Sequence, residues 1–208
     1  MKKNYKADYG FLPEKYPSGT HMCHIYGSRE ECRLVMSKFV ESGLLAQEKV
    51  IYLAEVATEA EIDGYLEDLG LDVSEHRKSG QLFISTAIKG YCPDGRFDAE
   101  RMIKAWRSFY KKADEDGYTA LRGAGEPLWI GEKVPGVENW FRYESLLNNL
   151  LVDYPLSGVI CQYNASKYDG ATLFEVLKVH PLMIVKDQIV YNPYYVPTDE
   201  YLAKHFSE

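Results

Sequence analysis

Two residues that can do chemistry lie close together near the start of the chain, in the segment GTHMCHIYGSREEC at residues 19–32. His21 and Cys23 are two positions apart, so on a strand both side chains project from the same face. Such a pair can supply a thiolate nucleophile or ligands for a metal ion. A zinc site needs two further ligands, and Cys161 and His180 complete the set only if the fold brings them there. We therefore predict no catalytic residue and no metal site.

Three interpretations of Cys23 remain open. A packed small hydrophobe is favoured, because unpaired cysteines are among the most buried residues. Cys23 could also form a soft pocket wall that contacts a ligand, or act as a thiolate, which requires a lowered pKa. His180 precedes Pro181 at the end of a predicted helix, so a C-terminal cap is favoured over a role in a pocket.

The same segment has the order strand, turn, helix that carries the phosphate loop in nucleotide-binding α/β domains. It lacks the G-x-x-x-x-G-K-[ST] motif, however. Ser28 and Glu31 have the spacing of a capping box, in which the serine accepts from the amide of Glu31 and the glutamate reaches back to Ser28. Glu30 and Glu31 place two negative charges where a phosphate would bind. The sequence therefore argues against hydrolysis of ATP or GTP.

The segment RGAGEPLW at 122–129 is the second candidate for a site. Arg122 and Glu126 are expected at a strand end, either as a buried ion pair beside a pocket or as a salt bridge at the sheet edge. The two glycines between them permit close backbone approach or an unusual φ. Trp129 is a candidate pocket wall or lid, or the packed anchor of a loop.

Apolar runs of strand length alternate with amphipathic helical patterns along the chain. Strands are predicted at 20–26, 49–57, 81–87, 118–126 and 157–164, followed by a hairpin over 182–192 that turns at Lys186, Asp187 and Gln188. Helices are predicted at 29–43, 59–69, 99–113, 137–152 and about 170–180, and a surface loop at 88–97. This alternation predicts an α/β fold, a three-layer α/β/α sandwich with a mostly parallel central sheet and a C-terminal hairpin.

Ligands of open α/β sheets bind beyond the carboxyl ends of the strands. We therefore predict that Tyr26, Arg122, Glu126, Trp129 and Tyr163 converge on one cavity, in which Arg122 and Glu126 neutralise each other. The predicted ligand-binding residues are His21, Cys23, Tyr26, Arg122, Glu126, Trp129, Cys161, Tyr163 and His180. The tyrosine-rich stretch 190–197 suits a docking surface at least as well as a pocket.

The 208 residues favour one domain, which we place at 19–197, between a polar leader at 1–18 and a tail at 198–208. The net charge of −7 argues against direct binding of nucleic acid or an anionic membrane. No apolar stretch approaches the roughly 20 residues of a membrane span. The four cysteines are widely spaced, which predicts reduced thiols and a cytoplasmic protein.

Several motifs in this order resemble the MEDS domain, the methanogen/methylotroph DcmR-type sensory domain. They are GTHMCHIYGSREEC, SGLLAQEKVIYLAE, SGQLFI, FDAERMIKAW, LRGAGEPLW, WFRYESLLNNLL, GVICQYN and VLKVHPLMIV, over about residues 19–195. The resemblance implies a RecA/KaiC-like core that has lost its phosphate loop. It also implies the sensing of small hydrocarbon derivatives, such as halogenated or methylated one-carbon compounds.

Members of that family are usually fused to a histidine kinase or a DNA-binding regulator. This chain has no room for a kinase and no helix-turn-helix pattern before residue 19, so a stand-alone sensory module is expected. We predict that it binds a small molecule, needs no cofactor and signals to a histidine kinase or transcription regulator, with a homodimer as one option. The alternatives are a cysteine- or metal-dependent transferase and a scaffold or dimerisation module.

Overall fold

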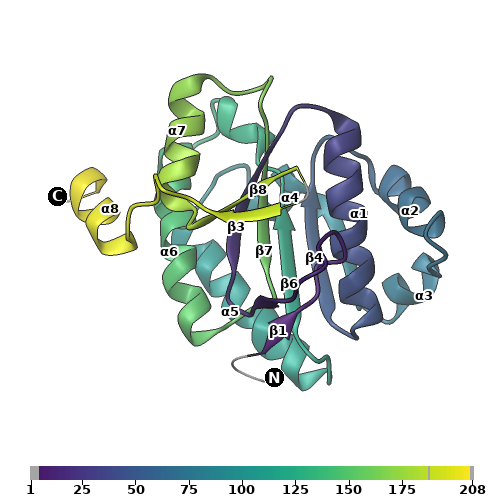
Figure 1. The fold of residues 1–208 in the computed structure, drawn as a ribbon. Coiled ribbons are helices and arrows are strands. Elements are labelled where there is room, and N and C mark those ends of the chain that lie inside the picture. The colour runs from purple at the N-terminus through teal and green to yellow at the C-terminus, as the bar shows by residue number, and fades with distance from the viewer. Residues whose placement is uncertain (1–4, 187, 207–208) are drawn as a thin grey trace.

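A seven-stranded sheet forms the centre of the molecule in the computed structural model, which describes residues 5–186 and 188–206 (Figure 1). In spatial order its strands are β5 (Leu82–Thr86), β4 (Lys49–Ala54), β6 (Leu121–Gly125), β7 (Val159–Asn164), β3 (His21–Tyr26), β8 (Leu182–Val185) and β9 (Gln188–Tyr191). Neighbouring strands pair in parallel, apart from β8 and β9, which are antiparallel. The predicted mostly parallel sheet and the closing hairpin are confirmed.

Helices cover both faces of the sheet, which gives the predicted three layers (Figure 1). One layer holds α1 (Arg29–Leu45), α2 (Glu59–Glu67) and α3 (Val73–Lys78). The other holds α4 (Ala87–Tyr91), α5 (Ala99–Glu115), α6 (Trp140–Asp153) and α7 (Gly170–Val179), with short 3-10 turns η1 (Leu128–Gly131) and η2 (Val137–Asn139). Two hydrophobic cores result, one on each side of the sheet. None of the described helices is long and apolar enough to cross a bilayer.

Strand β3 contributes to both cores because its side chains alternate between the two faces. Cys23 and Ile25 pack on the side of α6, whereas Met22 and Tyr26 pack on the side of α1. The neighbour β7 is paired in parallel with Cys23 opposite Cys161 and Ile25 opposite Tyr163. This register decides which predicted site residues can meet, because paired residues share a face.

The described part of the predicted polar leader is packed against the core. Two short strands, β1 (Lys6–Ala7) and β2 (Tyr16–Pro17), form a hairpin there. The side chain of Tyr9 is fully buried and donates to the backbone carbonyl of Ser157 at 2.8 Å. Gly158 is needed beside it, since a Cβ atom there would lie 2.8 Å from the tyrosine ring. The description as a polar leader therefore does not fit residues 5–17.

The predicted tail also contains structure. Helix α8 (Thr198–His205) contacts α6, and the hydroxyl of Thr198 donates to the carbonyl of Ser145 at 2.9 Å. The prediction of a surface loop at 88–97 was wrong for residues 88–91, which belong to α4. Tyr91 and Phe97 are buried in the core, so this connection is anchored by aromatic packing.

The two turns singled out in the sequence take shapes close to those expected. Ser28 caps α1 by accepting from the amide of Glu31 at 3.2 Å, as predicted. The carboxylate of Glu31 does not return to Ser28, however; it accepts from the amide of Gly27 at 2.8 Å. In the hairpin, Val185 pairs with Gln188, and Lys186 has a positive φ of 57°, while Asp187 lies outside the described residues.

Candidate functional site

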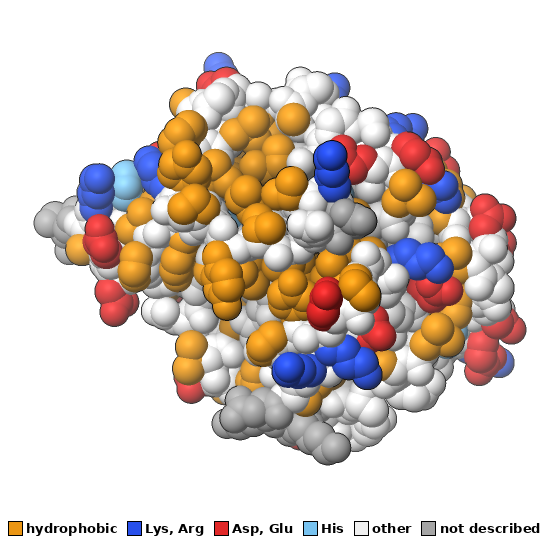
Figure 2. All heavy atoms as spheres, viewed as in Figure 1, with side chains coloured by type: hydrophobic (Ala, Val, Ile, Leu, Met, Phe, Trp, Pro, Cys, Tyr) orange, Lys and Arg blue, Asp and Glu red, His pale blue; other side chains and the backbone are white. Residues whose placement is uncertain are grey.

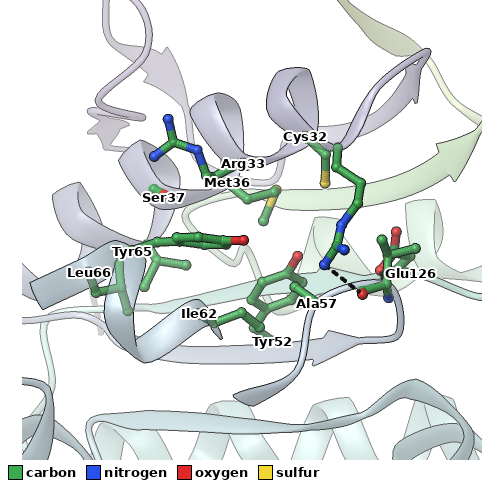
Figure 3. Close-up of a pocket in the computed structure, with 13 residues that line it drawn as sticks. Cys32, Arg33, Met36, Ser37, Tyr52, Ala57, Ile62, Tyr65, Leu66 and Glu126 are labelled. Carbon is green, nitrogen blue, oxygen red and sulfur yellow. Dashed lines mark hydrogen bonds between the residues drawn. The ribbon is translucent and has the colours of Figure 1, made fainter. Parts of the chain in front are cut away.

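A mostly apolar cavity lies between α1, α2 and the carboxyl end of β4 (Figure 3). Its volume is about 30 Å³. Such a space holds a molecule of roughly two or three heavy atoms. The lining residues are Arg29, Cys32, Arg33, Met36, Ser37, Val40, Tyr52, Val56, Ala57, Ile62, Tyr65, Leu66 and Glu126. We refer to it as the α1–α2 cavity.

Glu126 is the acidic group of this cavity, and it is almost fully buried. One carboxylate oxygen accepts from the amides of Glu55 at 2.9 Å and Val56 at 2.7 Å, which belong to the loop after β4. The other accepts from the hydroxyl of Tyr26 at the end of β3. Burial, followed by the charge of Glu126, raises the pKa of Tyr26 well above its usual value, so the hydroxyl stays a donor. Glu126 therefore joins the cavity loop to β3.

An exposed ion pair lies at the cavity and links its two helices. The guanidinium of Arg29 on α1 donates to the carbonyl of Val56 at 3.2 Å and to the carboxylate of Glu61 on α2 at 3.1 Å. Both side chains are largely exposed, so this pair adds little to stability. The two helices are held together mainly by the apolar side chains between them, which include Met36, Ile62 and Leu66.

Arg122 does not belong to this cavity, and its predicted ion pair with Glu126 was wrong. The strand begins at Leu121, so Arg122 lies near its amino end, about 13 Å along the strand from Glu126. Its guanidinium pairs with Glu48, with the Nε atom 2.6 Å from the carboxylate. Gly43 leaves room for this side chain, because a Cβ atom there would lie 2.7 Å from the Nε atom. Arg122 therefore forms its contacts at the amino edge of the sheet, opposite the edge that carries the cavity.

Trp129 and Tyr163 also lie away from the α1–α2 cavity, so the five predicted residues do not converge. Trp129 follows β6 on η1 and packs against Tyr91, Phe97 and Trp140 in the core beneath α6. It is the packed loop anchor of the two alternatives given above. Of the predicted five residues, the structure brings together Tyr26 and Glu126 in direct contact.

Tyr163 belongs to a second group of polar residues on the α6 side of the sheet. The carboxylate of Glu144 on α6 is fully buried there and accepts from the hydroxyl of Tyr163 at 2.9 Å. Three further predicted residues surround the other oxygen of that carboxylate. His21 lies 3.2 Å from it, Cys161 lies 3.3 Å from it and His180 lies 3.5 Å from it. We call His21, Glu144, Cys161 and His180 the Glu144 cluster.

Burial sets the protonation of this cluster. It lowers the pKa of His21, with a further contribution from His180, so His21 is neutral near pH 7. Burial and the adjacent Glu144 raise the pKa of the Cys161 thiol well above its usual value. Burial alone would raise the pKa of Glu144, but the adjacent imidazoles of His180 and His21 hold it well below the usual range. As it stands, the cluster contains an ionised carboxylate and a protonated thiol.

Cys23 lies beside the cluster without joining it. It is paired with Cys161 across the sheet, and its thiol donates to the carbonyl of Leu182 at 3.8 Å. Burial raises the pKa of this thiol to about 12. This environment agrees with a packed small hydrophobe. His180 is the C-terminal cap of α7, and its Nδ1 atom lies 2.7 Å from the carbonyl of Val176. The residue therefore caps the helix, as predicted, and also belongs to the Glu144 cluster.

A family model matches residues 20–181, which is more than three quarters of the chain. Its description is MEDS, MEthanogen/methylotroph, DcmR Sensory domain. The chain belongs to this family. A search of curated proteins found no match to this MEDS protein.

Solved structures similar to this MEDS protein have the KaiC type of fold. A KaiC-like protein of the hyperthermophilic archaeon Pyrococcus horikoshii OT3 is 13% identical, with a TM-score of 0.59 over 86% of this chain and 79% of that one. The flagellar accessory protein FlaH of Methanocaldococcus jannaschii is 12% identical, with a TM-score of 0.57 over 83% and 76%. At these identities the likeness concerns the fold, and it confirms the predicted RecA/KaiC-like core.

Glu144 is the residue of this MEDS domain that sequence reasoning missed. It lies four positions after Trp140 and three before Leu147, which places it in the middle of the apolar stripe of α6. A carboxylate at a core position is rarely buried unless it is paired. The glutamate within this apolar stripe could have been recognised from the sequence. It would have predicted a polar partner on the strands that face α6.

Hydrophobic side chains gather on the MEDS surface over α7 and the β8–β9 hairpin (Figure 2). Tyr191 is 89% exposed, and Phe174 and Tyr194 form an edge-to-face ring pair with centroids 5.7 Å apart. The tyrosine-rich stretch 190–197 is therefore largely at the surface. Its role as a docking surface stays a prediction.

Proposed function

We propose that this MEDS domain senses a small, mostly apolar molecule of the one-carbon class, which binds in the α1–α2 cavity and changes how the domain engages a regulatory partner. The observation that carries the proposal is the cavity itself. It lies at the carboxyl edge of a parallel sheet, where α/β domains bind ligands. Apolar walls and one convergent carboxylate are the usual composition of a small-molecule site.

The size of the cavity supports a ligand of this class. About 30 Å³ accepts a molecule such as dichloromethane or methanol and excludes a nucleotide or a sugar. A ligand of three heavy atoms reaches at best about −4.5 kcal/mol, which corresponds to a dissociation constant near 0.5 mM. Sensing would therefore take place at millimolar concentrations, as suits a growth substrate.

The contacts of Glu126 supply a route from the cavity to the rest of the domain. A ligand against Val56 and Ala57 presses on the loop whose amides Glu126 holds. Through the hydroxyl of Tyr26, the same carboxylate is attached to β3 at the centre of the sheet. A ligand that fits one arrangement of this loop better than another shifts the population between them.

Burial argues against a cysteine-dependent transferase as the alternative function. A thiolate nucleophile needs a lowered pKa and access to substrate. Burial raises the pKa of Cys23 to about 12 and that of Cys161 further.

Thermal unfolding in the presence of one-carbon compounds tests the proposal. At 10 mM, a ligand with a dissociation constant near 0.5 mM stabilises the domain by roughly 2 kcal/mol. This corresponds to a rise of about 4–8 °C in the midpoint for a chain of this size. Dichloromethane and methanol are the probes, and cyclohexanol at the same concentration is the control that is too large for the cavity.

Ala57→Leu fills the cavity and is expected to abolish the shift, because Ala57 lines it. Ala105→Leu is the matched control, since Ala105 is also partly buried but lies on α5, across the sheet. The proposal is overturned if no probe raises the midpoint by more than about 1 °C, or if Ala57→Leu keeps the full shift.

A further inference from the structure

The four donor atoms of the Glu144 cluster have the spacing of ligands around one metal ion. They all lie within 4.8 Å of one another. His21 Nε2 is 3.4 Å from Cys161 Sγ, and the three contacts to the Oε2 atom of Glu144 span 3.2–3.5 Å. Ligands at the usual zinc distances in a tetrahedron lie roughly 3.3–3.7 Å apart. These four separations are therefore close to those that a tetrahedral ion imposes, and the remaining pairs of donor atoms lie within 4.8 Å of each other.

Hydrogen bonds outside the cluster fix which nitrogen of each histidine carries the proton. His180 Nδ1 lies 2.7 Å from the carbonyl of Val176, which can only accept, so the proton is on Nδ1. His21 Nδ1 lies 2.9 Å from the amide oxygen of Asn148, whose nitrogen donates to the carbonyl of Val179. Because Nδ1 holds a proton in each ring, Nε2 is the atom that faces Glu144 and can bind either a proton or a metal ion.

Repulsion between an Nε2 lone pair and the buried Glu144 oxygen is avoided only if a cation, either a proton or a metal ion, lies between them. His180 Nε2 is buried and has no hydrogen-bond partner, and it faces Glu144 at 3.5 Å. Ligation by Nε2, with Nδ1 donating to a backbone or side-chain oxygen, is the usual arrangement of metal-bound histidine. The hydrogen bond from Tyr163 to the other oxygen of Glu144 orients the carboxylate in the same way.

We propose that His21, Glu144, Cys161 and His180 form a closed tetrahedral site for Zn²⁺. Two neutral imidazoles, one carboxylate and one thiolate neutralise the dication, so no net charge is buried. Binding displaces the proton of the Cys161 thiol, because zinc is bound by a thiolate. Nitrogen and sulfur ligands in this geometry select zinc over the oxygen-seeking Mg²⁺ and Ca²⁺.

Four protein ligands and complete burial make this a structural site. The ligands come from β3, α6, β7 and the end of α7, which lie next to one another in Figure 1. The ion would hold α6 and α7 against the two central strands. It would also fix His180, two residues before β8, and thus the start of the hairpin at the edge of the sheet.

Metal content of the purified full-length protein is the first measurement. Protein produced with added zinc is expected to hold about one zinc per chain after dialysis, and a strong chelator should lower its unfolding midpoint. Refilling with Co²⁺ should give visible absorption of tetrahedral cobalt and a thiolate-to-cobalt charge-transfer band. Less than about 0.1 zinc per chain, together with no cobalt spectrum, would overturn the proposal.

Variants assign the site to these residues. Cys161→Ser and His180→Gln are expected to reduce zinc content at least fivefold and to remove or shift the cobalt bands. Cys23→Ser is the matched control, since Cys23 is equally buried beside Cys161 but outside the cluster. Zinc retained in full by both cluster variants contradicts the assignment. If those variants fail to fold, a cobalt complex of the unaltered protein without a thiolate band contradicts it equally.

Discussion

The ion pair of Arg122 with Glu48 gives the sharpest prediction about stability, because both side chains are almost completely buried. The guanidinium also donates to the carbonyls of Phe39 and Asp8. Glu48→Gln keeps the shape of the side chain and an oxygen to accept from Ser157, but it removes the negative charge. A buried guanidinium is then left without a counter-charge.

Removing one partner of a buried ion pair typically destabilises a protein by about 3–5 kcal/mol. For a chain of this length the midpoint of thermal unfolding falls by roughly 2–4 °C per kcal/mol, so we expect a loss of about 6–20 °C. Urea unfolding gives the free energy directly. The cost arises at the amino edge of the sheet and at the N-terminal segment that Arg122 holds, so zinc content and the α1–α2 cavity should be unaffected.

Glu100→Gln is the matched control for this variant. It breaks the pair of Glu100 with Arg142, whose nitrogen and oxygen are 2.9 Å apart, but whose side chains are 58% and 33% exposed. An exposed pair of this kind contributes at most about 1 kcal/mol. If Glu48→Gln costs no more than Glu100→Gln, the argument that burial makes the difference is refuted.

Three further predictions follow from the same structure. ATP with magnesium should leave the unfolding midpoint unchanged, because Glu30 and Glu31 oppose phosphates at the start of α1; a rise of several degrees contradicts this. Cys23→Ser should cost about 1–3 kcal/mol, and Cys23 should react slowly with thiol reagents at neutral pH, as expected for a buried thiol with a pKa of about 12. Burial lowers the pKa of His24 from 6.5 to about 4, so the unfolded chain binds this proton more tightly and the free energy of unfolding falls by up to ~3 kcal/mol as pH drops through that range. Urea unfolding of His24→Gln at pH 7 and pH 5 should show a smaller fall than the unaltered protein.

The fold could be predicted from the sequence because the strands and helices alternate with strong periodicity. The pocket could not, and the reason is register. Tyr26 and Tyr163 both lie at strand ends, but Tyr163 pairs with Ile25, whose side chain points to the face opposite Tyr26. A shift of one residue between neighbouring strands moves a side chain to the other face. Nothing in a single sequence fixes that shift.

Arg122 shows a second limit of sequence reasoning. Its strand was predicted over residues 118–126, and Arg122 was assigned to the strand end; β6 begins at Leu121, so Arg122 is its second residue and lies near the amino end. Its partner Glu48 lies 74 residues earlier, just before β4, where no local pattern connects the two. The Glu144 cluster was partly within reach, because His21, Cys161 and His180 were candidates and the glutamate in an apolar stripe was visible.

The start of α1 explains why the proposed ligand site lies beside, and not at, the place of a phosphate loop. Free amides and the positive end of a helix dipole attract an anion there. In this chain the anion is supplied from within, because the carboxylate of Glu31 accepts from the amide of Gly27, one residue before the cap. The carboxylate thus occupies the place of a bound anion. Arg29, at the same end of α1, pairs with Glu61 on α2. The open space of the carboxyl edge is then the apolar gap between α1 and α2, which suits an uncharged ligand far better than a nucleotide.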